Sequence, residues 1–137
     1  MRTPIENKTA LITGAGAGLG RQIAIHLASL KVNLILVGRT TSKLEETKKL
    51  CDSYNINIDI YTVDLCEENQ IIKMFKSIKT LDYVINNAGY LTTASFEETS
   101  IEDMDLIYKT NVRAPFIVEG VVIGFVGSAI PLVILYY

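Results

Sequence analysis

Four glycines near the start of this chain, Gly14, Gly16, Gly18 and Gly20, have the type and spacing of residues that could bind a phosphate. They follow an apolar run, residues 8–12, that is typical of a buried strand, and they open a helical pattern over residues 19–30. Glycine permits positive φ and leaves no Cβ between the backbone and a ligand. The start of a helix adds free N–H groups and a positive dipole end. The stretch therefore predicts a pyrophosphate-binding loop, with tight helix-to-strand packing as the alternative.

Arg39 follows a second apolar run, residues 31–37, and is the next candidate for binding a charged ligand. At this place in a dinucleotide-binding sheet, an acidic residue binds the ribose 2′-hydroxyl of NAD, whereas an arginine suits the 2′-phosphate of NADP. Gly38 occupies the position where we expect such an acid. The residue types favour NADP over NAD, and a solvated surface arginine is the alternative.

Two further polar groups follow predicted strands. Asp64 comes after the third strand, where a carboxylate could accept a hydrogen bond from an adenine amino group or could cap the next helix. Residues 86–89, Asn-Asn-Ala-Gly, end the fourth strand. Their small side chains let a backbone approach a flat ligand, and an ordinary turn is the alternative.

The elements that must position these residues alternate along the chain. Apolar runs predict strands at residues 8–12, 31–37, 56–63 and 81–85. Helical spacing between them predicts helices with these faces: Leu19, Ile23, Leu27 and Leu30; Leu44, Thr47, Leu50 and Tyr54; Ile71, Phe75 and Ile78. Ser42 and Glu45 have the spacing of a capping box for the second helix. The alternation predicts an α/β fold with a Rossmann-like, doubly wound parallel sheet, whose ligand lies beyond the carboxyl ends of the strands.

Composition narrows the classes of partner. The chain has 137 residues, about one domain, with 13 Lys and Arg against 15 Asp and Glu. It contains no basic stripe, which argues against a nucleic-acid partner. Cys51 and Cys66 lack metal-ligand spacing, so we predict no metal site and two reduced thiols. The first eight residues lack the apolar core of a signal peptide, and we predict a cytoplasmic protein.

Taken together, Thr13-Gly14-x-x-x-Gly18-x-Gly20, Asp64 and residues 86–89 resemble the short-chain dehydrogenase/reductase family. The resemblance covers residues 5 to about 115, roughly the first half of a family member. It implies an NAD(P)(H)-dependent oxidoreductase that transfers hydride between carbonyls and alcohols. The residues implied to bind the cofactor, with Arg39 selecting NADP, are Gly14, Gly16, Gly18, Leu19, Gly20, Asp64, Leu65, Asn87, Ala88 and Gly89.

Asn111 is the one catalytic residue that the resemblance implies. Ser100 begins a further predicted helix, on which Met104, Ile107 and Asn111 share a face. A polar amide on an apolar face needs a partner. In the family, an asparagine at this point holds a water of the proton relay. A helix-ending asparagine is the alternative, because Pro115 follows closely.

The chain departs from the family after Asn111. The active-site Ser and Tyr-x-x-x-Lys should follow, yet no lysine comes after Asn111 in this sequence. A tyrosine with a pKa near 10 needs a neighbouring cation to serve as a general acid or base at neutral pH. We therefore expect a cofactor-binding fragment without turnover. A non-catalytic scaffold domain is the alternative, and neither a substrate nor an oligomeric state is predicted.

An uncharged stretch, residues 120–137, replaces the expected second half. Eighteen such residues could span a membrane, although the family also has apolar strands at this place. Residues 113–137 also resemble the last membrane segment of the cell-division permease of the ABC-transporter class. We predict an incomplete Rossmann domain over residues 1–115, its sheet truncated after the fourth strand and the following helix. Residues 116–137 are predicted as an apolar segment: a membrane-contacting tail, or the junction of a truncated or chimeric reading frame.

Overall fold

The computed structural model describes residues 4–126 and 133–136. Strands and helices alternate along the chain, as the apolar runs predict. The strands are β1 (Thr9–Thr13), β2 (Asn33–Gly38), β3 (Ile58–Thr62), β4 (Tyr83–Asn86) and β5 (Val133–Tyr136). The α-helices are α1 (Gly18–Ser29), α2 (Thr41–Cys51), α3 (Glu68–Ser77), α4 (Ile101–Tyr108) and α5 (Ala114–Val126). A 3₁₀ turn, η1 (Asp52–Tyr54), follows α2, and a π-helical turn, η2 (Lys109–Arg113), joins α4 to α5.

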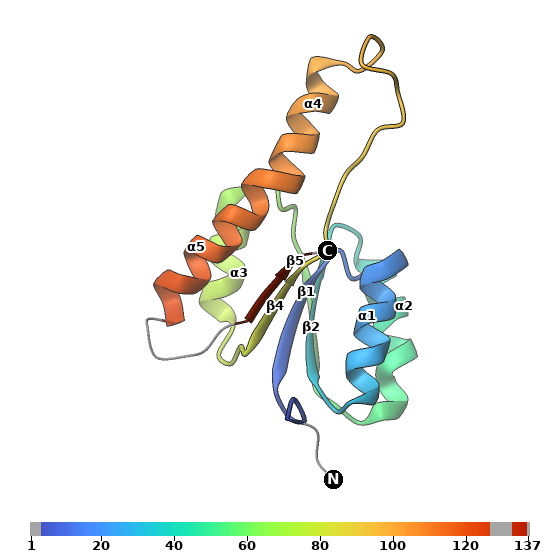
Figure 1. Ribbon diagram of the computed structural model, residues 1–137. Helices are drawn as coiled ribbons and strands as arrows, with labels where there is room; N and C mark the ends of the chain where they lie inside the picture. Colours follow the sequence, from blue (N-terminus) through green and yellow to red (C-terminus); the bar gives the residue numbers. More distant parts are fainter. Residues whose placement is uncertain (1–3, 127–132, 137) are drawn as a thin grey trace.

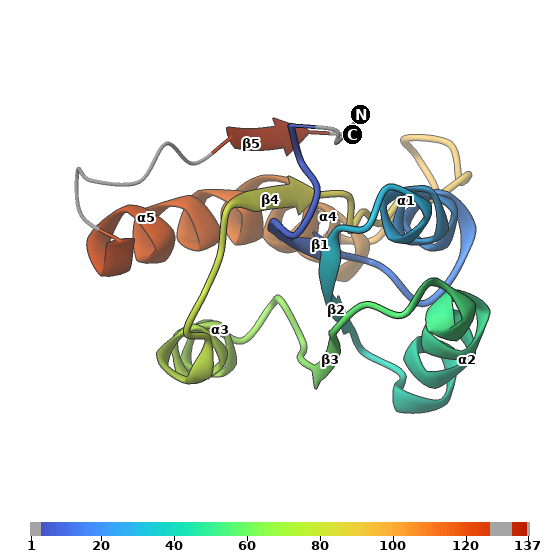
Figure 2. The same cartoon turned by 90° about the horizontal axis from the view of Figure 1, so that it is seen from below.

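The five strands form one parallel sheet in the order β3-β2-β1-β4-β5. Helices α1 and α2 cover one face, and α3 and α5 cover the other (Figures 1 and 2). The strand order reverses between β1 and β4, and in sheets of this kind ligands bind outside the carboxyl ends of the strands at such a point. The predicted fold class, an α/β Rossmann-like parallel sheet, is confirmed.

The central strand β1 is buried on both faces. Leu11 packs into the hydrophobic cluster beneath α3 and α5, whereas Ile12 packs into the cluster beneath α1 and α2, and both are fully buried. A strand with two buried faces reads as a continuous apolar run because neither side meets water. This burial fixes the position of the chain where β1 ends and the glycine-rich stretch begins.

The predicted buried faces of the first two helices are wrong in part. In α1 the buried residues are small, Gly20, Ala24 and Ala28, whereas Leu19 is 54% exposed. In α2, Leu50 is 52% exposed and Cys51 is buried in its place. Periodicity identifies a helix, but the side that faces the sheet is decided by how closely the helix approaches. Small residues allow α1 to lie close to β1.

The predicted capping box is also wrong. The helix α2 begins at Thr41, with Thr40 at the N-cap position and no side-chain cap, so Ser42 already lies inside the first turn. The predicted start of α4 is confirmed, because the Ser100 hydroxyl accepts a hydrogen bond of 3.0 Å from the Asp103 N–H. The first turn of α2 therefore presents backbone N–H groups without a capping side chain.

Part of the uncharged stretch belongs to the sheet. Its first residues continue α5, in which Val118 and Val122 are buried, and Val133–Tyr136 forms β5 and pairs in parallel with β4. The expectation that the sheet ends at the fourth strand is thus corrected. The rest of the stretch, residues 127–132 and 137, lies outside the described residues. Within residues 4–126 and 133–136, no helix is both long enough and apolar enough to cross a membrane. The division at residue 115 stays a prediction.

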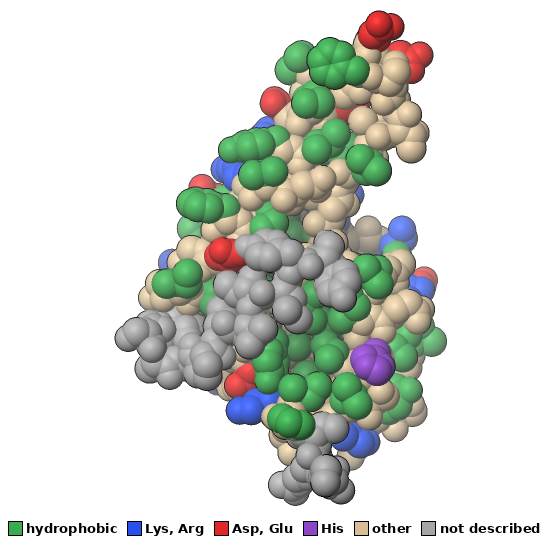
Figure 3. Space-filling model, in the orientation of Figure 1, with side chains coloured by type: hydrophobic (Ala, Val, Ile, Leu, Met, Phe, Trp, Pro, Cys, Tyr) green, Lys and Arg blue, Asp and Glu red, His purple; other side chains and the backbone are tan. Residues whose placement is uncertain are grey.

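Helices α4, η2 and α5 run continuously, and α4 projects away from the sheet (Figure 1). No residue of α4 is buried, and Met104 is 47% exposed, so the apolar face predicted for this helix is not covered within the described residues. Apolar side chains gather along this continuous helical segment in Figure 3. The large apolar residues exposed on α4, η2 and α5 are Ile101, Met104, Tyr108, Val112, Phe116 and Ile123.

Candidate functional site

The glycine loop, residues 14–20, uses positive φ at two positions. Gly14 has φ +67° and Gly18 has φ +53°, values that L-residues with a Cβ rarely adopt. A Cβ on Gly14 would lie 2.9 Å from the Ala88 Cα atom, whereas a Cβ on Gly18 would have nothing within 4 Å. The loop therefore touches the segment after β4 at Gly14 and opens to the outside at Gly18.

The other two glycines are packing positions. A Cβ on Gly20 would overlap the Gly14 carbonyl oxygen, and one on Gly16 would lie 3.0 Å from the Lys43 Cβ. Gly20 is buried, so it lets α1 start directly against the end of β1. Gly16 lets the loop meet the first turn of α2. Of the four predicted phosphate-site glycines, these two serve the close approach of backbone segments.

Asn87 and Thr13 join the loop to the end of β4. The buried Thr13 hydroxyl accepts hydrogen bonds from the N–H groups of Asn87 and Ala88, both at 3.0 Å. The Asn87 amide donates to the carbonyl oxygens of Thr13 at 3.1 Å and Gly14 at 3.3 Å. These bonds cross 73 to 75 residues of sequence. They hold the two strand ends together, and the predicted role of Asn87 in binding the cofactor stays a prediction.

The exposed part of the loop presents hydrogen-bond donors. In the described part of the chain, the backbone N–H groups of Ala17, Gly18 and Leu19 donate to no protein group. These three residues are exposed and stand at the amino-terminal end of α1, where the helix dipole is positive. Free donors, a positive dipole end and an open space at Gly18 together fit a phosphate group.

A cavity of about 120 Å³ brings most of the predicted residues together. It lies between the ends of β1, β2, β3 and β4, and it is lined by Gly14, Gly38, Arg39, Val63, Asp64, Leu65, Cys66, Ala88, Gly89, Tyr90 and Thr110. Six of these are predicted site residues, and they come from four separate parts of the sequence, one after each of these strands. The sequence analysis missed Cys66 and Thr110, whose side chains lie 3.6 Å apart, because nothing in their spacing marks them.

Asp64 does not cap α3. Its Oδ1 atom accepts a hydrogen bond of 2.9 Å from the Cys66 N–H, while Glu67 occupies the N-cap position of the helix. The capping alternative is therefore wrong. Within the described residues the second carboxylate oxygen of Asp64 accepts no hydrogen bond, and the residue lines the cavity. A carboxylate fixed by a turn at one oxygen can accept from a ligand amino group at the other.

Arg39 lies between this cavity and a second one of about 190 Å³. The second cavity is lined by Gly14, Gly16, Ala17, Gly38, Arg39, Thr40, Lys43 and Leu44. Arg39 is exposed, and neither it nor Lys43 forms an ion pair with any part of the chain that the structure describes. The sequence analysis missed Lys43, although it lies four residues after Arg39 in the first turn of the following helix.

Asn111 lies in η2, and its side chain is paired with a backbone segment. Its Oδ1 accepts from the Tyr90 N–H and its Nδ2 donates to the Tyr90 carbonyl oxygen, both at 2.8 Å. A Cβ on Gly89 would lie 3.6 Å from the Asn111 Oδ1 atom. The predicted partner for this amide is thus the chain just after β4. The role in a proton relay stays a prediction.

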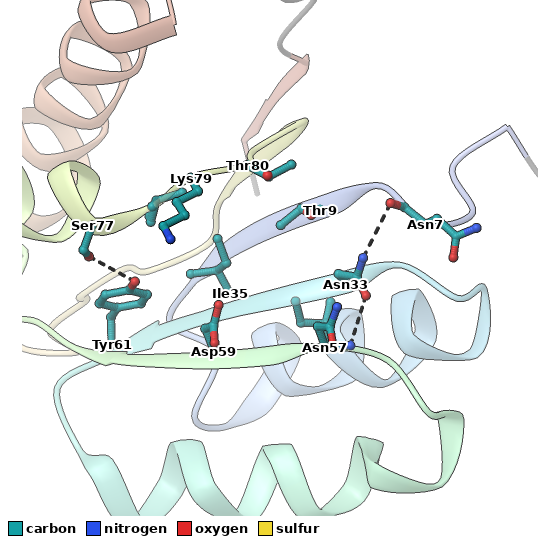
Figure 4. Close-up of a pocket in the computed structure, with 12 residues that line it drawn as sticks. Asn7, Thr9, Asn33, Ile35, Asn57, Asp59, Tyr61, Ser77, Lys79 and Thr80 are labelled. Carbon is teal, nitrogen blue, oxygen red and sulfur yellow. Dashed lines mark hydrogen bonds between the residues drawn. The ribbon is translucent and has the colours of Figure 1, made fainter.

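A larger cavity lies at the opposite end of the sheet (Figure 4). Its volume is about 440 Å³, and its lining includes Asn33, Asn57, Asp59, Lys79 and Thr80. None of the predicted site residues lines it. Volume would favour this cavity over the two at the carboxyl ends, whereas the free N–H groups of residues 17–19 and the positive-φ glycines Gly14 and Gly18 lie at the other end.

Comparisons with known proteins identify the same class of fold. A sequence model of the short chain dehydrogenase family matches residues 8–126. An uncharacterized oxidoreductase of Thermotoga maritima is 33% identical over 118 residues, which are 83% of this chain and 46% of that protein. An alcohol dehydrogenase of the archaeon Thermococcus sibiricus, solved in complex with 5-hydroxy-NADP, has a TM-score of 0.78 at 26% identity, over 85% of this chain and 52% of that one. NAD⁺-bound xylitol dehydrogenase has a TM-score of 0.82 at 25% identity, over 88% of this chain and 48% of that one.

This chain belongs to the short chain dehydrogenase family, whose members are oxidoreductases and whose solved relatives bind NAD or NADP. The family part of the predicted resemblance is confirmed. The chain spans about half the length of the curated relatives it matches.

Proposed function

We propose that this chain binds a nicotinamide dinucleotide at the carboxyl ends of β1, β2, β3 and β4 and prefers NADP to NAD. The observation that carries the proposal is the set of free N–H groups on Ala17, Gly18 and Leu19, which sits beside the open space at Gly18. These groups would bind the pyrophosphate. The 120 Å³ cavity, with the carboxylate of Asp64, would take the adenosine.

The preference for NADP rests on the charges around the second cavity. Arg39 and Lys43 both line it, and the uncapped first turn of α2 adds backbone donors. No acidic residue lines it. A 2′-phosphate would meet two cations there, and a free 2′-hydroxyl would meet no carboxylate. A charge-assisted hydrogen bond contributes roughly 1.5–3 kcal/mol, which is about tenfold or more in affinity.

Dissociation constants for NADP⁺ and NAD⁺, measured by calorimetry, test the preference. We expect Arg39→Ala to raise the Kd for NADP⁺ about tenfold and to leave that for NAD⁺ nearly unchanged. Lys49→Ala is the matched control, because Lys49 is an exposed cation on α2 that lines neither cavity. Equal affinity of the wild type for both dinucleotides would contradict the preference.

We further propose that these 137 residues bind the cofactor without turning over a substrate. A bound nicotinamide supplies hydride to a carbonyl, but the developing alkoxide also needs a proton donor. No Tyr-x-x-x-Lys follows Asn111 in this sequence, and Asn111 is occupied with the Tyr90 backbone. Positioned acid–base groups typically contribute 10²–10⁴-fold, so only traces of activity should remain.

Both cysteines are free thiols, which agrees with the proposal of a cytoplasmic protein.

A panel of ketones and aldehydes with NADPH, followed at the nicotinamide absorbance, tests this expectation. We expect rates within background for wild type and Asn111→Ala alike. Turnover that disappears in Asn111→Ala would mean that another residue supplies the proton, and it would overturn the view of this chain as a binding fragment.

A further inference from the structure

In the glycine loop, the backbone carbonyl oxygens and the exposed backbone N–H groups face in different directions. Its carbonyl oxygens are all used inside the protein: Gly14 O accepts from Asn87, Ala15 O from Thr47, and both Gly16 O and Ala17 O from Arg21. The N–H groups of the exposed residues that follow are left outside. A loop whose carbonyl oxygens faced outwards would repel a phosphate, so this sorting is what makes the loop an anion site.

Arg21 bonds two of these four carbonyl oxygens, Gly16 O through its side chain and Ala17 O through its backbone N–H, and no part of the sequence analysis singled it out. From the first turn of α1, its guanidinium donates to the Gly16 carbonyl at 2.6 Å, to the Lys43 carbonyl at 3.3 Å and to the Thr47 hydroxyl at 3.0 Å. An ion pair of 3.0 Å with Glu46 completes the set. The side chain of Arg21 is only 23% exposed, so these bonds are partly shielded from water.

Arg21 therefore links the loop to the first turns of α2. Thr47, on α2, is fully buried and makes a second connection to the loop, because its hydroxyl also donates to the Ala15 carbonyl at 2.8 Å. Gly16 lies close enough to α2 that a Cβ would be 3.0 Å from the Lys43 Cβ. One wall of the 190 Å³ cavity is the loop and the other is the start of α2. Arg21 does not line the cavity, and its side chain bonds to a residue of each wall, Gly16 and Lys43.

We propose that Arg21 is a positioning residue that sets the distance between the glycine loop and the cations of α2. It thereby selects a dinucleotide that carries an additional phosphate. Its guanidinium does not line the cavity. It acts by keeping the loop carbonyls turned inwards and by holding Lys43 at the cavity wall. This inference rests on the proposed binding of a dinucleotide and adds a residue that the 2′-phosphate does not touch.

Arg21→Lys in the 137-residue chain is the decisive variant, because it keeps the charge and loses the planar fork. One ammonium group cannot reproduce four donor contacts to Thr47, Gly16, Lys43 and Glu46. We expect the Kd for NADP⁺ to rise about tenfold and that for NAD⁺ to rise by less, so that the ratio of the two falls. Hydrogen exchange should speed up at the Ala15 and Arg21 amides, which are bonded in the structure, and stay unchanged in β1.

Glu45→Gln is the matched control. Glu45 is an exposed acid on α2 next to Glu46, and it forms no hydrogen bond or ion pair with Arg21 within the described residues, so this variant should keep wild-type affinities and exchange. If Arg21→Lys does not fold, Thr47→Val tests the same link, and we expect the same direction with a smaller change. Wild-type Kd values and exchange in a folded Arg21→Lys or Thr47→Val would overturn the inference alone. Failure of the wild type to bind either dinucleotide would overturn the proposed function and this inference with it.

Discussion

The two ends of the sheet carry cavities that differ in how their walls are built. At the carboxyl ends of the strands, cavities of about 120 and 190 Å³ are lined largely by the loops that follow β1, β2, β3 and β4. Two buried threonines fasten these loops: Thr13 bonds to the end of β4, and Thr47 bonds to both Ala15 and Arg21. At the amino ends, a larger cavity of about 440 Å³ is lined by residues of β1, β2 and β3 and by the chain around the end of α3. The smaller cavities are thus the ones whose lining loops are held by buried hydrogen bonds.

Hydrogen bonding at the amino ends has a different purpose. Asn33 accepts from the Asn57 N–H at 3.0 Å and donates to the Asn7 carbonyl at 3.5 Å, which joins the starts of the strands (Figure 4). Asp59 and Lys79 reach the cavity from opposite sides, and both are exposed. The polar groups there either close the fold or face water. Fixed, unused donors therefore distinguish the carboxyl end of the sheet, whereas the larger volume lies at the amino end.

Two glycine substitutions should separate packing from ligand binding at the carboxyl end. Gly20→Ala would place a Cβ against the Gly14 carbonyl and the Asn87 amide, and we expect a loss of about 3 kcal/mol in the free energy of unfolding. A Cβ at Gly18 has no protein atom within 4 Å, so we expect Gly18→Val to cost about 2 kcal/mol, chiefly from the positive φ. Urea unfolding measures both values.

Dinucleotide affinity tests the role of Gly18 directly. Gly18→Val should stay folded and lose dinucleotide affinity, because the branched side chain occupies the space in front of the free N–H groups. Gly18→Ala is the milder companion variant. Retained affinity in Gly18→Val, within a factor of two by calorimetry, would reduce the loop to a packing element.

The two cysteine thiols lie in different places, one at the proposed site and one away from it. Cys66 lines the 120 Å³ cavity and is partly exposed, whereas Cys51 is fully buried beneath α2. We expect iodoacetamide to modify Cys66 about tenfold faster or more, and NADP⁺ to slow that reaction. Peptide mass spectrometry distinguishes the two sites. Equal rates at both thiols, or no protection by NADP⁺, would contradict this placement of the ligand.

The pH dependence of stability should follow Cys51. Burial, reinforced by the negative charge of Asp52, raises the pKa of the Cys51 thiol above its ordinary value of 9.0. The folded chain therefore holds this proton more tightly than the unfolded chain. The contribution is complete below the unfolded pKa and is lost as the pH rises through the folded one. Unfolding free energy should fall more steeply above pH 9.0 in the wild type than in Cys51→Ala.

The smallest effect is expected at the amino-end cavity. Asp59→Asn and Lys79→Met each remove a charge from its walls, yet both residues lie at the end of the sheet away from Arg39 and the glycine loop. Dinucleotide affinity should change by less than about twofold, because exposed charges are screened over such a span. Calorimetry on the two variants checks this. A change as large as that of Arg39→Ala would break the distinction between the two ends.

Several particular elements show how far the sequence could be interpreted. Residues 10–12 of β1 and 34–37 of β2 are continuously apolar because both faces are buried, so these strands could be recognised without tertiary information. The glycine spacing identified the loop, and Arg39 and Asp64 were found because ligands meet the carboxyl ends of parallel strands. All of these depend on local pattern and on a general rule of topology.

Other residues could not be found in that way. Leu19 and Leu50 fit a helical period, yet both are exposed, because the distance between helix and sheet decides which side is buried. The spacing of Ser42 and Glu45 suggested that Ser42 is the N-cap, but α2 begins two residues earlier than such a cap requires, at Thr41, which bonds to Thr62 on β3. Arg21 looked like an ordinary surface cation. Its partners, Thr47 and the Lys43 carbonyl, come from a helix more than twenty residues away.

By itself, the sequence determined the alternation of strands and helices, the position of the glycine loop and the residue types at the strand ends. Local periodicity and backbone chemistry fix those features before any distant contact forms. Only the tertiary structure decided that Gly20 packs while Gly18 stays open, that Asn111 pairs with the Tyr90 backbone, and that residues 133–136 join the sheet beside β4. The physical reason is that each depends on the separation of two segments distant in sequence, which close packing and complete hydrogen bonding set together.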